Sequence, residues 1–238
     1  GSGADEIDVD VTTLAAVSAD GIYVRELDST TGDGLTVDAT AAMTVQQANF
    51  NSTLTPVTDA ALSDLRTTQA GAIKVVVDAN DVTVNEGSGN GSDVAGGVVA
   101  GSSGDVLLES TAADVVLTAD VASGTGHITV TAGDDVAQQA DISTAPTGTV
   151  LITAANASVD GVGTDGIVMT SGTTTTATGS TVRLSATGES DLYLSQIVAS
   201  NVSLLAMRDI VDNLAAETAN VTAATLRMVA DAATSDLA

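Results

Sequence analysis

The chain has 238 residues, of which 44% are hydrophobic, so it is long enough to bury a sizeable core. It carries 31 acidic and 6 basic residues, a formal charge of −25, which argues against nucleic acid and anionic membranes as partners. Cysteine is absent, which excludes disulfides and thiolate chemistry, and no run of about 18 apolar residues is available to span a membrane.

The first residues indicate that the chain is a piece excised from a longer protein. Residues 1–3, Gly-Ser-Gly, are typical of a cloning scar, and the acidic residues that follow do not resemble a signal peptide. Residues 4–238 are expected to form one domain. Only Tyr23, Phe50 and Tyr193 are aromatic, so Val, Ile, Leu and Ala must fill the interior, as in a narrow and regularly layered stack.

A short sequence phrase recurs along most of the chain. It has apolar residues at positions i and i+2 and a small residue, Ala or Ser, at position i+4. Alternation with period two predicts a strand with one buried face, ending in a small residue at a corner. The first residues of the ten copies are Leu35, Val75, Val106, Val115, Ile128, Val150, Ile167, Val182, Val202 and Leu226.

The spacing of these copies predicts the architecture. Val106, Ile128 and Val150 are 22 residues apart, and two-residue hairpin turns are mostly missing between strands. A unit of about 20 residues is typical of a solenoid coil. We therefore expect an all-β fold, a right-handed parallel β-helix with two or three short strands per coil, about 4.8 Å of rise per coil, and one irregular insert.

Two segments depart from the repeat. Residues 41–70 are predicted to be an insert with a short helix from Thr58 to Arg66, for which Thr58 is the N-cap. Residues 86–104 are rich in Gly and Ser and are predicted to form a flexible loop. Inserts on solenoids often bind partners, but loops also lengthen without acquiring a function, and we favour the second interpretation here.

Candidate catalytic residues are sparse. His127 is the only histidine, stands at the start of a strand, and is interpreted as a corner residue. Asp134 and Asp135 resemble the paired acids of polysaccharide-cleaving enzymes, but neighbours on a strand would point to opposite faces. No catalytic, cofactor-binding or metal residue is therefore assigned, and the chain is not expected to be an enzyme.

Calcium is the only cofactor for which the sequence offers a motif. Gly89-x-Gly91-x-Asp93 and Gly161-x-Gly163-x-Asp165-x-Ile167 are similar to part of the nonapeptide that binds Ca²⁺ in repeat-in-toxin rolls. In those rolls the ion lies between successive turns, whereas these two copies are far apart in the chain. We therefore expect the glycines to serve turns, and no cofactor to be bound.

Two later segments allow more than one interpretation. Residues 170–182 are Thr-rich, which leaves an ice-binding surface as a remote alternative, but one Thr-rich loop is not a ladder. Residues 214–233 are Ala-rich and could form an amphipathic helix. Because Leu226, Met228 and Ala230 repeat the strand phrase, we predict strands there instead.

Both ends of the chain resemble a known group of proteins. The stretches VTTLAAVSADGIYVREL (11–27) and NVSLLAMRDIVDN…TANVTAATLRMVADAATSDLA (201–238) are similar to the long repeats of giant bacterial surface and secreted proteins related to filamentous-haemagglutinin adhesins. The resemblance implies a secreted or cell-surface β-helix that is one module of a tandem array. Its partners would be neighbouring modules of the same parent chain and a ligand on a host or partner cell, with no membrane insertion.

The expected function is that of a structural or adhesive module, a rigid spacer or interaction rod in a large extracellular filament. The alternative is a β-helix that binds or depolymerises carbohydrate. Sugar rings stack on exposed aromatic side chains in a groove, and a chain with three aromatic residues is poorly equipped for this.

Overall fold

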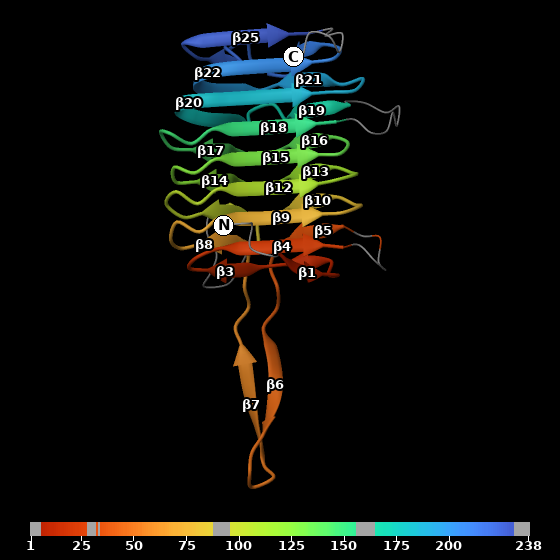
Figure 1. Cartoon of the computed structure of the whole chain (residues 1–238), viewed down its shortest axis with the longest axis vertical. Helices are drawn as coiled ribbons and strands as arrows, with labels where there is room; N and C mark the ends of the chain where they lie inside the picture. The colour runs from red at the N-terminus through yellow and green to blue at the C-terminus, as the bar shows by residue number, and fades with distance from the viewer. Residues whose placement is uncertain (1–5, 28–31, 33, 88–95, 156–164, 231–238) are drawn as a thin grey trace.

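The computed structural model describes residues 6–27, 32, 34–87, 96–155 and 165–230, and every element in them is a β-strand. Successive coils stack along the long axis of the molecule, with the N-terminal coil at one end and the C-terminal coil at the other (Figure 1). Each coil contributes up to three strands, which stack in parallel on the matching strands of the next coil. The expected parallel β-helix is confirmed.

We name the three rows of stacked strands face 1, face 2 and face 3. Face 1 consists of β1 (Ile7–Val9), β4 (Ile22–Glu26), β9 (Ile73–Val77), β12 (Val106–Ser110), β15 (Ile128–Ala132), β18 (Val150–Ala154), the second halves of β20 (Thr174–Ala186) and β22 (Gln196–Ala206), and β25 (Thr225–Val229).

Faces 2 and 3 complete each coil. Face 2 consists of β2 (Thr13–Leu14), β5 (Leu35–Val37), β10 (Val82–Val84), β13 (Val115–Leu117), β16 (Val136–Gln138), β19 (Gly166–Met169), β21 (Asp191–Leu194) and β23 (Ile210–Asp212). Face 3 consists of β3 (Ala16–Ser18), β8 (Leu65–Thr67), β11 (Val98–Ala100), β14 (Val121–Ser123), β17 (Ile142–Thr144), the first halves of β20 and β22, and β24 (Val221–Thr222).

The strands of face 1 run to the right in Figure 1, and the chain returns to the left behind them while it rises, so the coil is right-handed. Faces 1 and 3 belong to one 15-stranded sheet because β20 and β22 run through both, whereas face 2 is a separate 8-stranded sheet. A register shift between Ala177 and Thr181 marks the bend between the two halves of β20.

Small aliphatic side chains fill the interior in straight rows. In face 1, Leu108, Val130, Ile152 and Leu184 lie one above the other and are fully buried. Ala132, Ala154 and Ala186 end their strands in a second buried row, at the corner where the interior narrows. The recurrent phrase is thus explained by the stacking of equivalent positions, as expected.

Some copies of the phrase belong to other rows than their sequence match implies. The copies that begin at Leu35, Val115 and Ile167 lie in face 2, not in the face 1 row. The copy at Val75 is shifted by two residues, because Val75 aligns with Leu108 rather than with Val106. The buried positions of all three faces carry the same kinds of side chain. The sequence alone therefore does not show to which row a copy of the phrase belongs.

The two expected departures from the repeat are only partly correct. No helix forms from Thr58 to Arg66: Thr58 lies in strand β7 (Leu54–Asp59), and Leu65 and Arg66 lie in solenoid strand β8. Residues 86–104, expected to be a loop, include the buried strand β11. At the C-terminal end, β24 and β25 confirm strands rather than a helix.

One element leaves the solenoid. Strand β6 (Met43–Ala48) pairs antiparallel with β7, and this hairpin projects along the long axis beyond the N-terminal coil (Figure 1). It is inserted between β5 of face 2 and β8 of face 3. An isolated bridge between Thr40 and Leu62 closes its base, with N–O distances of 2.7 and 3.2 Å.

Candidate functional site: the acidic corners, the open ends and the hairpin

Aspartates occupy equivalent corner positions in successive coils. Each carboxylate accepts a hydrogen bond from the backbone N–H that starts the strand in the next coil, so it replaces a partner that the sheet does not supply there. The donor-to-acceptor pairs are Asp114 to Asp81 (3.1 Å), Asp135 to Asp114 (3.0 Å), Gly166 to Asp135 (2.6 Å), Asp141 to Asp120 (2.9 Å), Thr174 to Asp141 (2.7 Å), His127 to Asp105 (2.7 Å) and Asp209 to Asp191 (2.8 Å).

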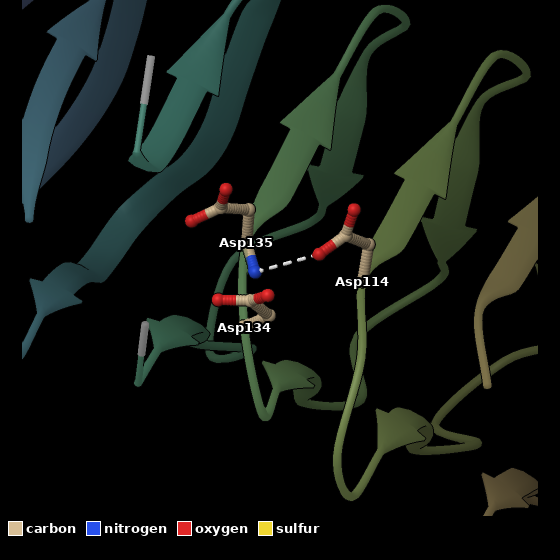
Figure 2. Close-up of side chains that lie close together, drawn as sticks. All are labelled: Asp114, Asp134 and Asp135. Carbon is tan, nitrogen blue, oxygen red and sulfur yellow. Dashed lines mark hydrogen bonds between the residues drawn. The ribbon is translucent and has the colours of Figure 1, made fainter. Parts of the chain in front are cut away.

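This ladder gathers three carboxylates at one place. Asp134 and Asp135 lie in the turn before β16 and not on a strand, so the expectation that they point apart is wrong. Together with Asp114 they offer oxygen atoms that all lie within 4.8 Å of one another. Figure 2 shows the Asp114 carboxylate facing the backbone nitrogen of Asp135. All three side chains are half-buried.

One carboxyl group of the cluster, that of Asp135, has a shifted pKa. Burial raises the pKa of the Asp135 carboxyl to about 6, and the negative charges of Asp134 and Asp114 add to this rise. The Gly166 N–H, which donates to the carboxylate, works in the opposite direction. The cluster has the oxygen ligands that hard cations prefer, but its carboxylates already serve the backbone of the next coil.

His127 has the expected corner position. It precedes β15, and its Nδ1 accepts a hydrogen bond from the Thr149 N–H at 3.2 Å and lies 2.8 Å from the Thr149 hydroxyl. The imidazole therefore accepts a hydrogen bond from a backbone N–H of the next coil of face 1, as the Asp105 carboxylate does one coil earlier. These contacts with Thr149 give the histidine a structural role at this corner.

Most residues of the two calcium-like motifs lie outside the described residues, namely Gly89, Gly91, Asp93, Gly161 and Gly163. Of the remaining two, Ile167 is a core residue of β19, and Asp165 lies 3.9 Å from the Arg208 guanidinium. The expectation that these glycines serve turns and hold no calcium therefore stays a prediction.

The aromatic residues do not converge on a groove. Tyr23 lies on face 1, Tyr193 on face 2 and Phe50 at the tip of the hairpin. The Thr-rich strand does not form a Thr ladder either, since Thr176 has Ser143 and Val198 as its neighbours in the outward row.

The N-terminal end of the solenoid is open. Within the part of the chain that the structure describes, β1 pairs only with β4, β2 only with β5 and β3 only with β8, so each presents an edge that no described strand covers. Ile7 is 67% exposed. A hollow of about 500 Å³ leads into the first coil between the three faces, lined by Ile7, Val9, Leu14, Ala16, Val17, Ser18, Gly21, Ile22, Tyr23 and Val24.

The C-terminal end is open in the same way. Among residues 165–230, which the structure describes at this end, strands β25 and β24 pair only with β22, and β23 pairs only with β21. Leu226 and Met228 are 48% and 51% exposed. Both residues line a hollow of about 370 Å³ together with Leu194, Ile210 and Val221. The interior rows of the solenoid thus reach solvent at both ends.

The hairpin is the most exposed element among the described residues. Every residue of β6 and β7 is exposed, including Met43, Val45, Leu54 and Val57, and Phe50 at its tip is fully exposed. The sequence set residues 41–70 apart from the repeat but did not predict a hairpin, because Gln46, Gln47 and Pro56 interrupt the alternation that marks the strands of the solenoid.

Comparison of the chain with protein-family models, with curated proteins and with solved structures finds no match. No described helix could span a membrane. The function is therefore inferred from the geometry of the ends and of the hairpin.

Proposed function

We propose that the chain is a rigid structural module of an extracellular or cell-surface filament, which stacks end to end on neighbouring modules and acts as a spacer or interaction rod. The observation that carries this proposal is the pair of open ends. An apolar interior and unpaired strand edges together are the features that a neighbouring coil covers in solenoid arrays.

The side-chain rows at the two ends match on two of the three faces. Following the register from coil to coil, Ile7 of face 1 stands in the row that ends at Met228. On face 3, Ala16 stands in the row that ends at Val221. A second copy placed above β25 would continue both apolar rows.

On face 2 the side chains at the two ends of the solenoid match less well. There Leu14 stands in the row that ends at Asp212, so an apolar side chain would meet a carboxylate. Asp212 is exposed, and its carboxylate accepts hydrogen bonds from the Asn220 side chain and the Leu214 N–H. It therefore keeps its charge at the rim, while faces 1 and 3 supply the apolar contact.

The charge of the body suits a spacer. A net charge of −25 keeps the sides of separate rods apart and solvated, so association is confined to the ends. Three of the basic side chains are already engaged with acids of the same molecule: Arg25 with Asp78, Lys74 with Glu6, and Arg208 with Asp165 and Asp191.

A fusion of two copies tests the proposal. If the copies stack, the fusion melts at a higher temperature than one copy, because each interface between neighbouring repeats adds stability. A matched control carries Met228→Asp in the first copy and Ile7→Asp in the second, which places two charges in the junction. A fusion that melts at the temperature of the single copy, like this control, would refute stacking.

A further inference from the structure

The direction of the hairpin carries an inference that rests on the proposed stacking and goes beyond it. We propose that the β6–β7 hairpin is an arm that packs on the preceding copy in the stack, along the corner between its faces 2 and 3. The occupant of this surface is thus a second copy of the same chain, and the contact determines both the order and the rotation of neighbouring copies.

The arm extends away from the solenoid of its own chain. It extends along the stacking axis past the N-terminal coil, away from all other coils of its chain (Figure 1). Each of its strands has six residues, and at about 3.3 Å per residue it reaches about 20 Å, the height of about four coils. A copy stacked below the N-terminal coil would lie alongside it.

The arm has too few internal contacts to be stable in water without a partner. A two-stranded hairpin is marginal unless a third strand or an apolar surface supports it. The side-chain hydrogen bonds within this hairpin join the Thr44 and Thr58 hydroxyls, 2.7 Å apart, and link Asn49, Asn51, Thr53 and Thr55 near the loop. Its apolar side chains stay uncovered.

The register places three apolar side chains on one face of the hairpin. Val45 is paired with Val57, and Met43 lies two residues before Val45, so these three share one face of the hairpin. Phe50 is added at the tip, the position farthest from the body. Met43, Val45 and Val57 thus form an exposed apolar stripe on one face of the arm, and Leu54 lies on the other face.

The near absence of charge on the arm favours a second copy of the chain as its partner. Residues 41–61 contain one charged residue, Asp59, in a chain of 31 acidic and 6 basic residues. A basic partner would be attracted to the acidic body rather than to this neutral arm. A second acidic copy is repelled by the body, and the neutral arm is the part that approaches it without added repulsion.

The preceding copy offers a suitable surface at the matching place. The arm leaves between β5 and β8, the corner between faces 2 and 3, and in the last coil this corner is the segment 213–220 between β23 and β24. Its side chains are small or apolar apart from one acid, Glu217, and two asparagines: Leu214, Ala215, Ala216, Thr218 and Ala219. Residues 215–219 are exposed, so the arm would cover them.

Two-copy fusions test the arm with an internal control. The arm of the second copy can reach the first copy, whereas the arm of the first copy has no copy before it. We expect that replacing residues 41–61 by a two-glycine turn in the second copy lowers the melting temperature of the fusion by about 5 °C, and that the same replacement in the first copy leaves it unchanged. Val45→Ser with Val57→Ser in the second copy should reproduce the loss without shortening the chain.

Hydrogen exchange gives an independent readout. In a fusion with one copy isotope-labelled, the amides of residues 43–59 should exchange more slowly in the second copy than in the first. If the fusion melts higher than one copy but both deletions are equal and both arms exchange alike, stacking stands and the arm proposal fails. If the fusion gains no stability at all, the stacking itself fails. A single copy that dimerises through its hairpin, with no preference between the two positions in the fusion, would also overturn the proposal.

Discussion

At the scale of single residues, the alternation of buried and outward positions decides which substitutions the solenoid tolerates. Val130 and Ile152 are fully buried in the face 1 row, whereas Thr129 points outward between Leu107 and Leu151. These assignments follow from the two-residue period and were predictable from the sequence. Ser185 is an exception: it stands in the outward row of face 1, next to Thr153, and is nevertheless buried, which the two-residue period does not predict.

We expect Val130→Asp to destabilise the fold by at least about 3 kcal/mol, since it buries a charge without a partner. Thr129→Asp should change the free energy of unfolding by less than about 1 kcal/mol, because the new carboxylate reaches water. Urea denaturation followed by circular dichroism measures both. Equal losses would contradict the register.

The corner residues explain two sequence features that periodicity did not predict. Aspartate recurs before strands because its carboxylate caps the next coil, as described for Asp114 and Asp135. Glycine recurs at the corner between faces 3 and 1, at Gly104, Gly126 and Gly148, because each lies against the carbonyl oxygen of the glycine in the coil below. A Cβ on Gly126 or Gly148 would lie 2.2 Å from that oxygen, so a side chain cannot fit.

Asp135→Asn should stabilise the protein at pH 7.5 by about 1 kcal/mol, a value reduced for solvent screening of a half-buried group. The folded pKa of Asp135, about 6, is above the ordinary value of 3.8. The contribution of the wild-type carboxyl is therefore most favourable below pH 3.8 and is lost as the pH rises through 6. Asparagine keeps an oxygen for the Gly166 N–H but carries no charge.

The advantage of the asparagine variant should accordingly shrink between pH 6 and pH 4. Thermal unfolding across this range measures it. Asp135→Ala is the matched control, because it removes both the charge and the acceptor and should not share the gain at pH 7.5. An asparagine variant less stable than wild type at pH 7.5 would contradict the assignment.

At the scale of elements, strands were easier to predict than their assignment to faces. The strand phrase and its 22-residue spacing indicated the central coils, where β12, β15 and β18 follow one another without inserts. Strands of the first coils were harder to assign because the hairpin lies between β5 and β8. A helix from Thr58 to Arg66 was wrong because intrinsic helix propensity is weak, and the pairing of β7 with β6 overrides it.

Removing the hairpin from a single copy should leave the solenoid almost unchanged. Its strands are wholly exposed and pair only with each other, so replacing residues 41–61 by a two-glycine turn removes no core side chain. We expect the free energy of unfolding to change by less than about 1 kcal/mol in urea. A cooperative loss of several kcal/mol would mean that the hairpin belongs to the core of its own chain.

At the scale of the whole molecule, the solenoid is a rod with two open ends. Nine strands of face 1 in the described residues, stacked about 4.8 Å apart, span about 40 Å. The fold class was therefore predictable from repetition, since every coil buries the same kind of side chain. The hairpin was not predictable, because residues 41–61 lie outside the repeat and pair only with each other.

Small-angle X-ray scattering of the two-copy fusion measures the central claim most directly. If the second solenoid continues the first, the scattering profile is that of one straight rod, with a cross-section equal to that of a single copy and a body lengthened by about 40 Å or more. Two copies that tumble independently on a linker would give a bent, broadened distance distribution with two separate maxima, and this result would contradict end-to-end stacking.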